Sequence, residues 1–282
     1  MDTNRRPVVV GVDGSPAGSG AVRWAADEAV RLRRPLRIAH ALEAPDPARE
    51  DIDEQRLTLD AAAEARQWQP GLEVTTATRR GSAAAVLLEH SRHAALVVVG
   101  GRGIGGFPSL RLGSVGIHLA AHAPCPVLVI HHAERWAGPE SVLPAHGPVV
   151  VGADGSDAGE AALQLAFQEA ALRQAPVRAV RAWQCPPRRF GRSADPDRAC
   201  AAVLGDLATS LEPWRAKYPN VEVEPRAVEG RPAPVLLAEA AGALLVVVGA
   251  RGRGGFEDLR LGGTAWQVLQ HADAPVLVAR RQ

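Results

Sequence analysis

This sequence of 282 residues has little aromatic content, few cysteines and almost no lysine, and each scarcity excludes a class of protein. Aromatic residues make up 4% of the chain, so aliphatic Ala, Val and Leu must fill the core. Lys217 is the only lysine, and the P-loop pattern G-x-x-x-x-G-K-[ST] is absent. The cysteines Cys125, Cys185 and Cys200 are too scattered for a disulfide framework or a zinc site, so we expect reduced thiols.

Charge and hydropathy give no sign of a nucleic-acid or membrane partner. The 32 basic residues nearly balance the 31 acidic ones, and the net charge of +1 provides no basic surface for polyanions. No apolar run reaches the roughly 18 residues of a membrane span, and no signal-peptide core follows the N-terminus. We therefore expect a soluble cytoplasmic protein that binds neither nucleic acid nor membrane.

The sequence contains two copies of one pattern. The segment P-V-V-V-G-V-D-G-S, which begins at Pro7, returns as P-V-V-V-G-A-D-G-S at Pro148. The segment L-V-V-V-G-G-R-G, which begins at Leu96, returns as L-V-V-V-G-A-R-G at Leu245. Because these matches are too long for chance, the sequence predicts two homologous domains.

Each predicted domain, over residues 1–140 and 146–282, alternates short aliphatic runs with longer helical stretches. In the first copy the pattern predicts strands at residues 8–12, 36–42, 73–77, 96–100 and 127–131, and helices at residues 20–34, 55–69, 83–92 and 113–121. Strands separated by helices imply an α/β fold with an open, doubly wound parallel sheet and right-handed crossovers. Ligands of such sheets bind beyond the carboxyl ends of the strands, where the strand order reverses.

The glycine-rich segment after the fourth predicted strand is a candidate phosphate site. Gly100, Gly103, Gly113 and Ser114 give the spacing G-x-x-G-x9-G-S, and Ser114 opens the last predicted helix. Glycines let the backbone approach a ligand closely, and a helix N-terminus attracts anions with its N–H groups and dipole. Arg102 could add a charge-assisted contact, and the Ser114 hydroxyl could donate to a phosphate oxygen.

Two other strand ends in the first copy complete a candidate nucleotide site. Asp13 follows the first strand, where its carboxylate could accept hydrogen bonds from ribose hydroxyls or hold a metal that bridges the phosphates. The end of the second strand, residues 39–42, lies beside the first strand in this topology. From that position alone we expect it to supply backbone donors and an apolar wall for an adenine ring.

The paired openings V-G-V-D-G-S and V-G-A-D-G-S, together with G-x-x-G-x9-G-S, resemble the universal stress protein family in its tandem-domain form. The resemblance covers nearly the whole chain. It implies five-stranded sheets of order 3-2-1-4-5 that hold ATP, with or without Mg²⁺, at the strand-one Asp and the glycine loop. It also implies a regulatory protein rather than an enzyme, with an unidentified protein partner, and it leaves a homodimer open.

Carried over residue by residue, the resemblance implies one nucleotide site in each copy. The first comprises Asp13, Ala41, Gly100, Arg102, Gly103, Gly113, Ser114 and Val115. The second comprises Asp154, Ala182, Gly249, Arg251, Gly252, Gly262, Gly263 and Thr264.

The second copy departs from the pattern at Gly263, where the motif has Ser or Thr and the hydroxyl comes one residue later, at Thr264. One residue turns a helix by about 100°, so Thr264 need not point where Ser114 does. The Gly263 backbone N–H is still available. We therefore predict weaker or altered nucleotide binding by the second copy.

Other functions stay open at this stage. Glycines after a strand are often only a turn, so the chain could be an interaction or scaffold protein of the same fold that binds no nucleotide. A slow ATP hydrolase is a further alternative, although neither a general base nor a G-x-S-x-G motif is present. A nucleotidyl transferase would need an S-G-G-x-D-S type loop, where this chain has D-G-S-P. His118 and His122 have metal-like spacing but no acidic partner nearby, so we predict no metal site there.

Overall fold

The chain folds into two compact units, the first ending at Leu143 and the second running from Pro144 to Arg280. The computed structural model describes residues 6–42, 51–103, 112–138, 142–185, 195–252 and 260–280, and of residues 51–54 the backbone alone. The domain limits given above, 1–140 and 146–282, stay a prediction.

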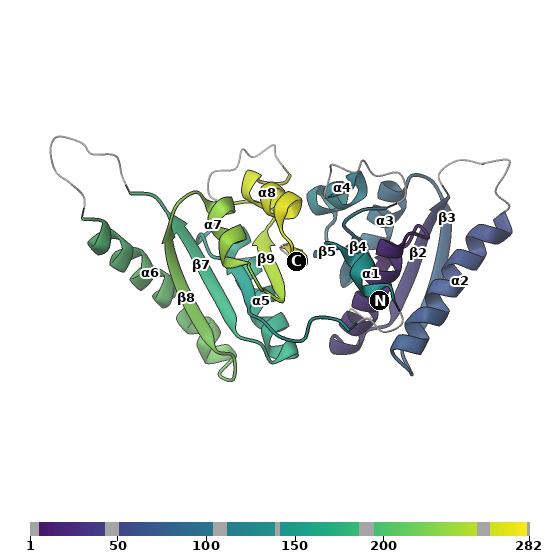
Figure 1. Ribbon diagram of the computed structural model, residues 1–282, viewed down its shortest axis with the longest axis horizontal. Helices are drawn as coiled ribbons and strands as arrows, with labels where there is room; N and C mark the ends of the chain where they lie inside the picture. The colour runs from purple at the N-terminus through teal and green to yellow at the C-terminus, as the bar shows by residue number, and fades with distance from the viewer. Residues whose placement is uncertain are drawn as a thin grey trace. The chain divides into compact units, whose positions relative to one another are not determined.

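The first unit alternates strands with helices, as the sequence predicts (Figure 1). Its elements are β1 (Val8–Gly11), α1 (Pro16–Arg31), β2 (Leu36–Leu42), α2 (Asp51–Trp68), β3 (Val74–Arg80), α3 (Ala83–Ser91), β4 (Leu96–Gly100), α4 (Ser114–His122), β5 (Val127–Ile130) and the 3₁₀ helix η2 (Ala133–Trp136). The strands are parallel and follow the order β3-β2-β1-β4-β5. This order confirms the predicted doubly wound sheet.

The second unit repeats the arrangement. Its elements are β6 (Val149–Gly152), α5 (Asp157–Arg173), β7 (Val177–Trp183), α6 (Pro196–Lys217), β8 (Val223–Glu229), α7 (Pro232–Glu239), β9 (Leu245–Gly249), α8 (Gly263–His271) and β10 (Val276–Ala279). Its strands are also parallel, in the order β8-β7-β6-β9-β10. The two homologous α/β folds that the repeated sequence predicts are therefore both present.

The central strands are buried because helices cover both faces of each sheet. In the first unit α1 packs against α2, and α3 packs against α4. Val8, Val9 and Val10 are completely buried between these layers. Continuous valine runs suit such strands, whereas β3, at the edge of the sheet, has exposed positions. Ligands of doubly wound sheets bind beyond the carboxyl ends of the central strands.

The first helix confirms the cap that the sequence suggests and differs from the periodic pattern in its extent. The apolar spacing predicts residues 20–34, while Ser15 and Pro16 are suited to a helix cap and a first turn, and α1 does begin at Pro16, where the Ser15 hydroxyl accepts a hydrogen bond from the Gly18 N–H at 3.1 Å. The helix ends at Arg31, and Arg33 adopts a left-handed conformation with φ of 53°. The left-handed residue Arg33, rather than Pro35, therefore ends the helix, and the Arg34 N–H donates to the Ala29 carbonyl at 2.8 Å.

One ion-pair network distinguishes the two units. In the second unit the Arg178 Nε lies 2.9 Å from Glu224 Oε2 and 3.8 Å from Glu239 Oε2. In the first unit, among the described residues, the corresponding Arg37 donates a single long hydrogen bond, of 3.5 Å, to the Thr75 hydroxyl. His90 in α3 is equivalent to Glu239 in α7. Each comes three residues after a leucine, Leu87 or Leu236, that lies against the end of the first strand in the same unit.

We expect His90 to make the first unit less stable below about pH 6.5. Burial, then the charges of Arg37 and Arg79, lower the pKa of His90 from its ordinary value of 6.5, while Glu89 partly opposes them. As the pH falls below 6.5 the unfolded chain binds a proton that the folded chain still rejects, so the free energy of unfolding decreases until the folded pKa is reached. Urea unfolding of His90→Gln should show a smaller decrease, by at most about 1.4 kcal/mol per pH unit.

The exposed neighbour His93 provides the matched control. His93→Gln should keep the pH dependence of the parent protein. An unchanged pH dependence in His90→Gln would assign the acid sensitivity to other groups.

Candidate functional site

Asp13 is held in a fixed orientation just beyond β1. Gly14, with φ of 83°, turns the chain away from the sheet. One carboxylate oxygen of Asp13, Oδ1, accepts hydrogen bonds from the Ser15 N–H at 3.0 Å and from the Ser15 hydroxyl at 2.6 Å. The same hydroxyl caps α1. Strand end, carboxylate and helix start therefore form one compact turn.

The second unit builds the same turn around Asp154. Its Oδ1 accepts from the Ser156 N–H at 2.9 Å and from the Ser156 hydroxyl at 2.6 Å. The hydroxyl in turn accepts from the Gly159 N–H at 3.0 Å, and Gly155 has φ of 73°. In both units the serine of the turn thus holds the aspartate through Oδ1.

The Oδ2 atom of each aspartate faces the glycine segment that follows the fourth strand of its unit. A Cβ at Gly252 would lie 2.8 Å from Asp154 Oδ2, and a Cβ at Gly103 would collide with Asp13 Oδ2. Glycine is required where backbone and carboxylate come this close. The structure therefore brings together the strand-one aspartate and the glycine segment, which the sequence separates by about 90 residues.

A backbone hydrogen bond connects the last glycine of the motif to the glycine segment in each unit. The Gly113 N–H donates to the Gly101 carbonyl at 2.7 Å, and the Gly262 N–H donates to the Ala250 carbonyl at 2.8 Å. No side chain caps either of the helices that follow, α4 and α8. Their first N–H groups therefore lie at a helix N-terminus beside the glycine segment, which is the arrangement that binds phosphate. Residues 104–111 and 253–259, between the glycines, lie outside the described residues.

A cavity of about 490 Å³ marks this region in the second unit. All eight positions expected from the sequence line it: Asp154, Ala182, Gly249, Arg251, Gly252, Gly262, Gly263 and Thr264. Ala182 comes from the end of β7, which supports grouping that strand end with the others. Its volume lies in the range of small-molecule sites. We call this cavity the second site.

The corresponding residues of the first unit are called the first site. Asp13, Gly103 and Gly113 lie together as described above, and a Cβ at Gly100 would lie 3.0 Å from the Ala17 carbonyl oxygen. The remaining expected residues are Ala41 on β2, Arg102 beside the glycines, and Ser114 and Val115 in the first turn of α4. Ser114 and Arg102 are exposed, whereas Val115 is half-buried.

Sequence reasoning missed several residues that line the second site. They are Gly152, Ala153, Gly159, Val180, Arg231, Pro232, Ala233, Pro234, Leu236, Val248, Ala265 and Gln267. Arg231 and the residues after it follow the edge strand β8. Because the carboxyl ends of all parallel strands meet at one edge of a sheet, the end of β8 was the signal that could have found them.

His40 and Arg181 each contact the backbone carbonyl of the residue that precedes a site aspartate. The His40 Nδ1 lies 2.8 Å from the carbonyl oxygen of Val12, the residue before Asp13. The Arg181 Nε donates at 2.8 Å to the equivalent carbonyl, that of Ala153. The strand ladder ends at these peptides, so a side chain provides the partner that a neighbouring strand no longer offers.

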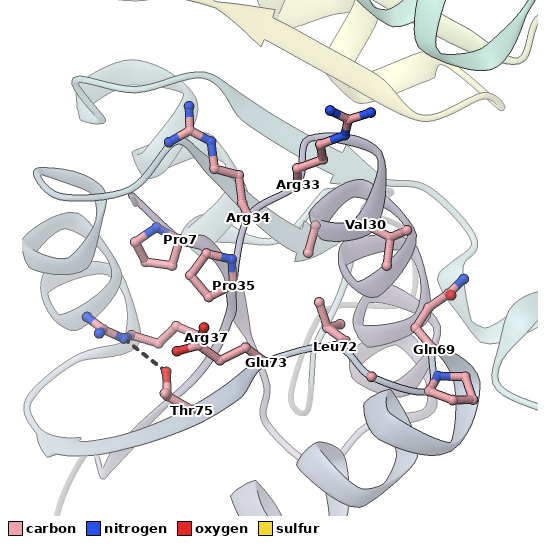
Figure 2. A pocket seen from close by; sticks show the side chains of 13 residues that line it. Pro7, Val30, Arg33, Arg34, Pro35, Arg37, Gln69, Leu72, Glu73 and Thr75 are labelled. Carbon is pink, nitrogen blue, oxygen red and sulfur yellow. Dashed lines mark hydrogen bonds between the residues drawn. The ribbon is translucent and has the colours of Figure 1, made fainter. Parts of the chain in front are cut away.

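A larger cavity, of about 610 Å³, lies at the other end of the first sheet (Figure 2). Pro7 and Pro35 line it, so it borders the amino ends of β1 and β2. Figure 2 shows the guanidinium groups of Arg33 and Arg34 pointing away from one another, while Arg37 reaches Thr75. Basic residues are favoured near the C-terminus of a helix such as α1 by the helix dipole. The guanidinium groups of Arg33 and Arg34 therefore do not converge on one point of this cavity.

The described residues contain no group of three His, Cys, Asp or Glu side chains placed to hold a metal ion. The rings of His118 and His122 lie 4.7 Å apart by their centroids. None of the helices within the described ranges is both long and apolar enough to cross a membrane.

Comparison with known proteins gives the same family for both units. The model of the universal stress protein family matches residues 4–131 and 146–280. Universal stress protein Rv2623 of Mycobacterium tuberculosis is 38% identical to this chain, and the match covers 97% of this chain and 96% of the relative. A universal stress protein of Mycolicibacterium smegmatis is 36% identical over the same shares.

A solved structure shows that the likeness extends to the fold. The crystal structure of a universal stress protein from Archaeoglobus fulgidus matches with a TM-score of 0.72 and 18% identity, and the match covers 100% of both chains.

Proposed function

Because this chain belongs to the universal stress protein family, we propose that it is a regulatory protein that binds ATP at the first and second sites. The proposal includes a cytoplasmic location, where the cysteines would be reduced, and a response to nucleotide through a homodimer or a separate protein partner. No catalytic residue is assigned.

The observation that carries the proposal is the composition of the second site. One cavity of about 490 Å³ is lined by a fixed carboxylate, a glycine segment, a helix N-terminus and the end of β7. A phosphate chain would receive the backbone N–H groups of the glycine segment and of α8, together with the charge of Arg251. The Asp154 carboxylate would accept from ribose hydroxyls, and Ala182 would border the base.

The first site offers the same groups in the same roles. Gly100, Arg102 and Gly103 would meet the phosphates together with the first turn of α4, where Ser114 and Val115 lie. Asp13 would meet the ribose, and Ala41 the base. Mg²⁺ is usually held by one or two carboxylates together with substrate phosphates, so Asp13 and Asp154 are also the groups that would hold it. Titration with and without a chelator separates these two roles of the carboxylates.

Mass spectrometry of small molecules released from the purified full chain tests the proposal directly. We expect an adenine nucleotide in the released fraction. Nucleotide-free protein should then bind ATP in calorimetry, and ATP at about 100 times its Kd should stabilise the folded chain by about 2.7 kcal/mol. If no nucleotide is released and ATP changes neither the heat signal nor the melting temperature, the chain is an interaction protein of this fold.

A further inference from the structure

Arg231 occupies a position in the second site that costs the fold stability. It is the residue before the first turn of α7, and its side chain makes no capping hydrogen bond. In the first unit the corresponding residue is Ser82, whose hydroxyl accepts from the Ala85 N–H at 3.4 Å. Serine is among the preferred residues at this position, and a positive charge there opposes the positive end of the helix dipole.

Nothing in the described chain compensates for this charge. The Arg231 side chain is exposed, forms no hydrogen bond or ion pair with any described residue, and lines the second site. The first turn of α7 contains no acidic residue, and Pro232 and Pro234 have no N–H group to offer an anion. Residues that break a local preference without a compensating contact often serve a ligand.

The position of α7 places this charge at the cavity that the proposed phosphates would occupy. The helices α7 and α8 pack against each other, and both begin at the edge of the sheet where the second site lies. Axes of packed helices lie about 8–10 Å apart, a gap that a long arginine side chain and a chain of phosphates can bridge together. Asp154, Arg231 and Arg251 are the charged residues among those described around the cavity.

We propose that Arg231 binds the distal phosphates of the nucleotide in the second site and makes that site selective for ATP over AMP. This inference rests on the proposed function. The second copy lacks the hydroxyl that Ser114 provides in the first, and Arg231, from a different position in the site, supplies a cation instead. The second site therefore prefers ATP to AMP more strongly than the first site does, because the first site has Ser82 at the position of Arg231.

Exchange of the two equivalent residues tests this assignment. Calorimetry is done in an Asp13→Asn background, which weakens the first site so that the second is measured. Arg231→Ser should lower the affinity for ATP roughly ten-fold and leave the affinity for AMP nearly unchanged, because a charge-assisted contact is lost only with the longer phosphate chain. The same substitution should raise the melting temperature of the nucleotide-free protein by roughly 2–4 °C, because serine caps α7.

Opposite changes in stability and ATP affinity are the signature of a ligand-binding role, since a purely structural residue would lower both. Arg215→Ser removes a surface charge of the same unit outside the cavity and should leave the ratio of the ATP and AMP affinities unchanged. Ser82→Arg, measured in an Asp154→Asn background, should increase that ratio at the first site.

The possible failures are distinguishable. If the parent protein binds no ATP, the proposed function fails. If the parent binds ATP and Arg231→Ser keeps the ratio of ATP to AMP affinity, the proposed function stands and the role of Arg231 is refuted.

Discussion

Replacing Gly20 by alanine is expected to destabilise the first unit by about 3 kcal/mol, at the upper end of overpacking substitutions. Gly20 lies in α1, directly against the backbone of Ala133 in η2, and a Cβ at this position would collide with the Ala133 carbonyl. Neither partner is a flexible side chain, so the helix and η2 would have to separate. Separation would also disturb the edge-to-face contact of Trp24 with Trp136, whose rings lie 5.4 Å apart. Urea unfolding of the full chain measures the loss.

Gly205 is the matched control, because it is a glycine inside a helix with open space around it. Gly205→Ala in α6 should stabilise its unit by about 0.5–1 kcal/mol through helix propensity alone. If Gly20→Ala is equally stabilising, then η2 does not rest on α1 in solution.

The sequence predicted elements best where apolar runs have sharp ends. The strands at residues 36–42 and 96–100 were predicted to the residue, because Pro35 precedes the first and a glycine closes the second. The edge strand β3 extends to Arg80, three residues beyond its prediction, because pairing with β2 holds polar residues that a hydrophobic pattern does not mark. The helix η2 was not predicted, so the sequence could not explain why position 20, which lies against η2, is a glycine.

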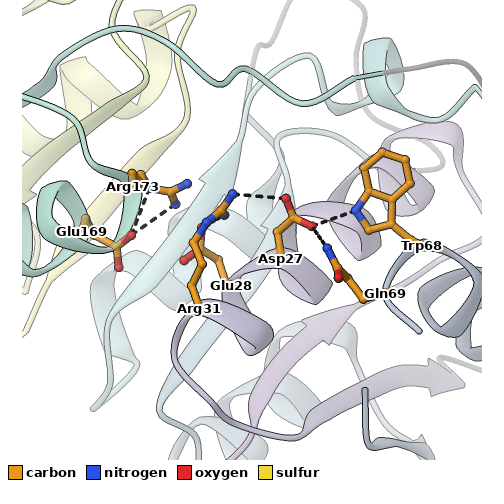
Figure 3. A network of polar contacts seen from close by, with 7 residues as sticks. All are labelled: Asp27, Glu28, Arg31, Trp68, Gln69, Glu169 and Arg173. Carbon is orange, nitrogen blue, oxygen red and sulfur yellow. Dashed lines mark hydrogen bonds and ion pairs between the residues drawn. The ribbon is translucent and has the colours of Figure 1, made fainter. Parts of the chain in front are cut away.

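The spacing of apolar residues indicates which face of a helix is buried, but it does not indicate which partners a buried charge on that face contacts. Glu28 follows the apolar spacing of α1 and is only 1% exposed. Its Oε1 lies 3.4 Å from Arg31, which also lies 3.2 Å from Asp27 (Figure 3). Asp27 accepts a further hydrogen bond from the Trp68 indole at 2.8 Å. Such a network depends on α2 crossing α1 at one particular place, which residue spacing cannot specify.

The candidate site was predictable to the extent that it lies in the repeated motifs. All eight positions assigned to the second site line one cavity, because strand ends and helix starts are fixed by the doubly wound topology. Arg231 and Arg181 were missed for a different reason. Arg181 lies on β7 and Arg231 follows β8, both outside the motifs, so their positions at the site are set only after β7 and β8 have joined the sheet.

Neutralising both site aspartates should reduce ATP binding the most. Asp13→Asn and Asp154→Asn each remove the charge that would meet ribose hydroxyls or Mg²⁺, while the remaining amide oxygen can still accept from Ser15 or Ser156 as Oδ1 does now. A hydrogen bond to a charged group is worth about 1.5–3 kcal/mol, so each variant should lose roughly ten-fold or more in affinity at its own site. The double variant should need roughly ten-fold or more ATP than the parent to half-saturate both sites, and calorimetry with a two-site fit measures all three.

The serine of the same turn separates binding from folding. Ser15→Ala removes the hydroxyl that caps α1 and donates to Asp13, but keeps the carboxylate charge. It should lower the free energy of unfolding by about 1 kcal/mol and change ATP affinity much less than Asp13→Asn does.

The two aspartate variants should lose different amounts of ATP affinity. Because Gly263 replaces the expected hydroxyl in the second copy, the second site has fewer side-chain contacts to share the loss. Equal losses would mean that the departure at Gly263 has no effect on binding, and an unchanged affinity in the double variant would remove the carboxylates from the site altogether.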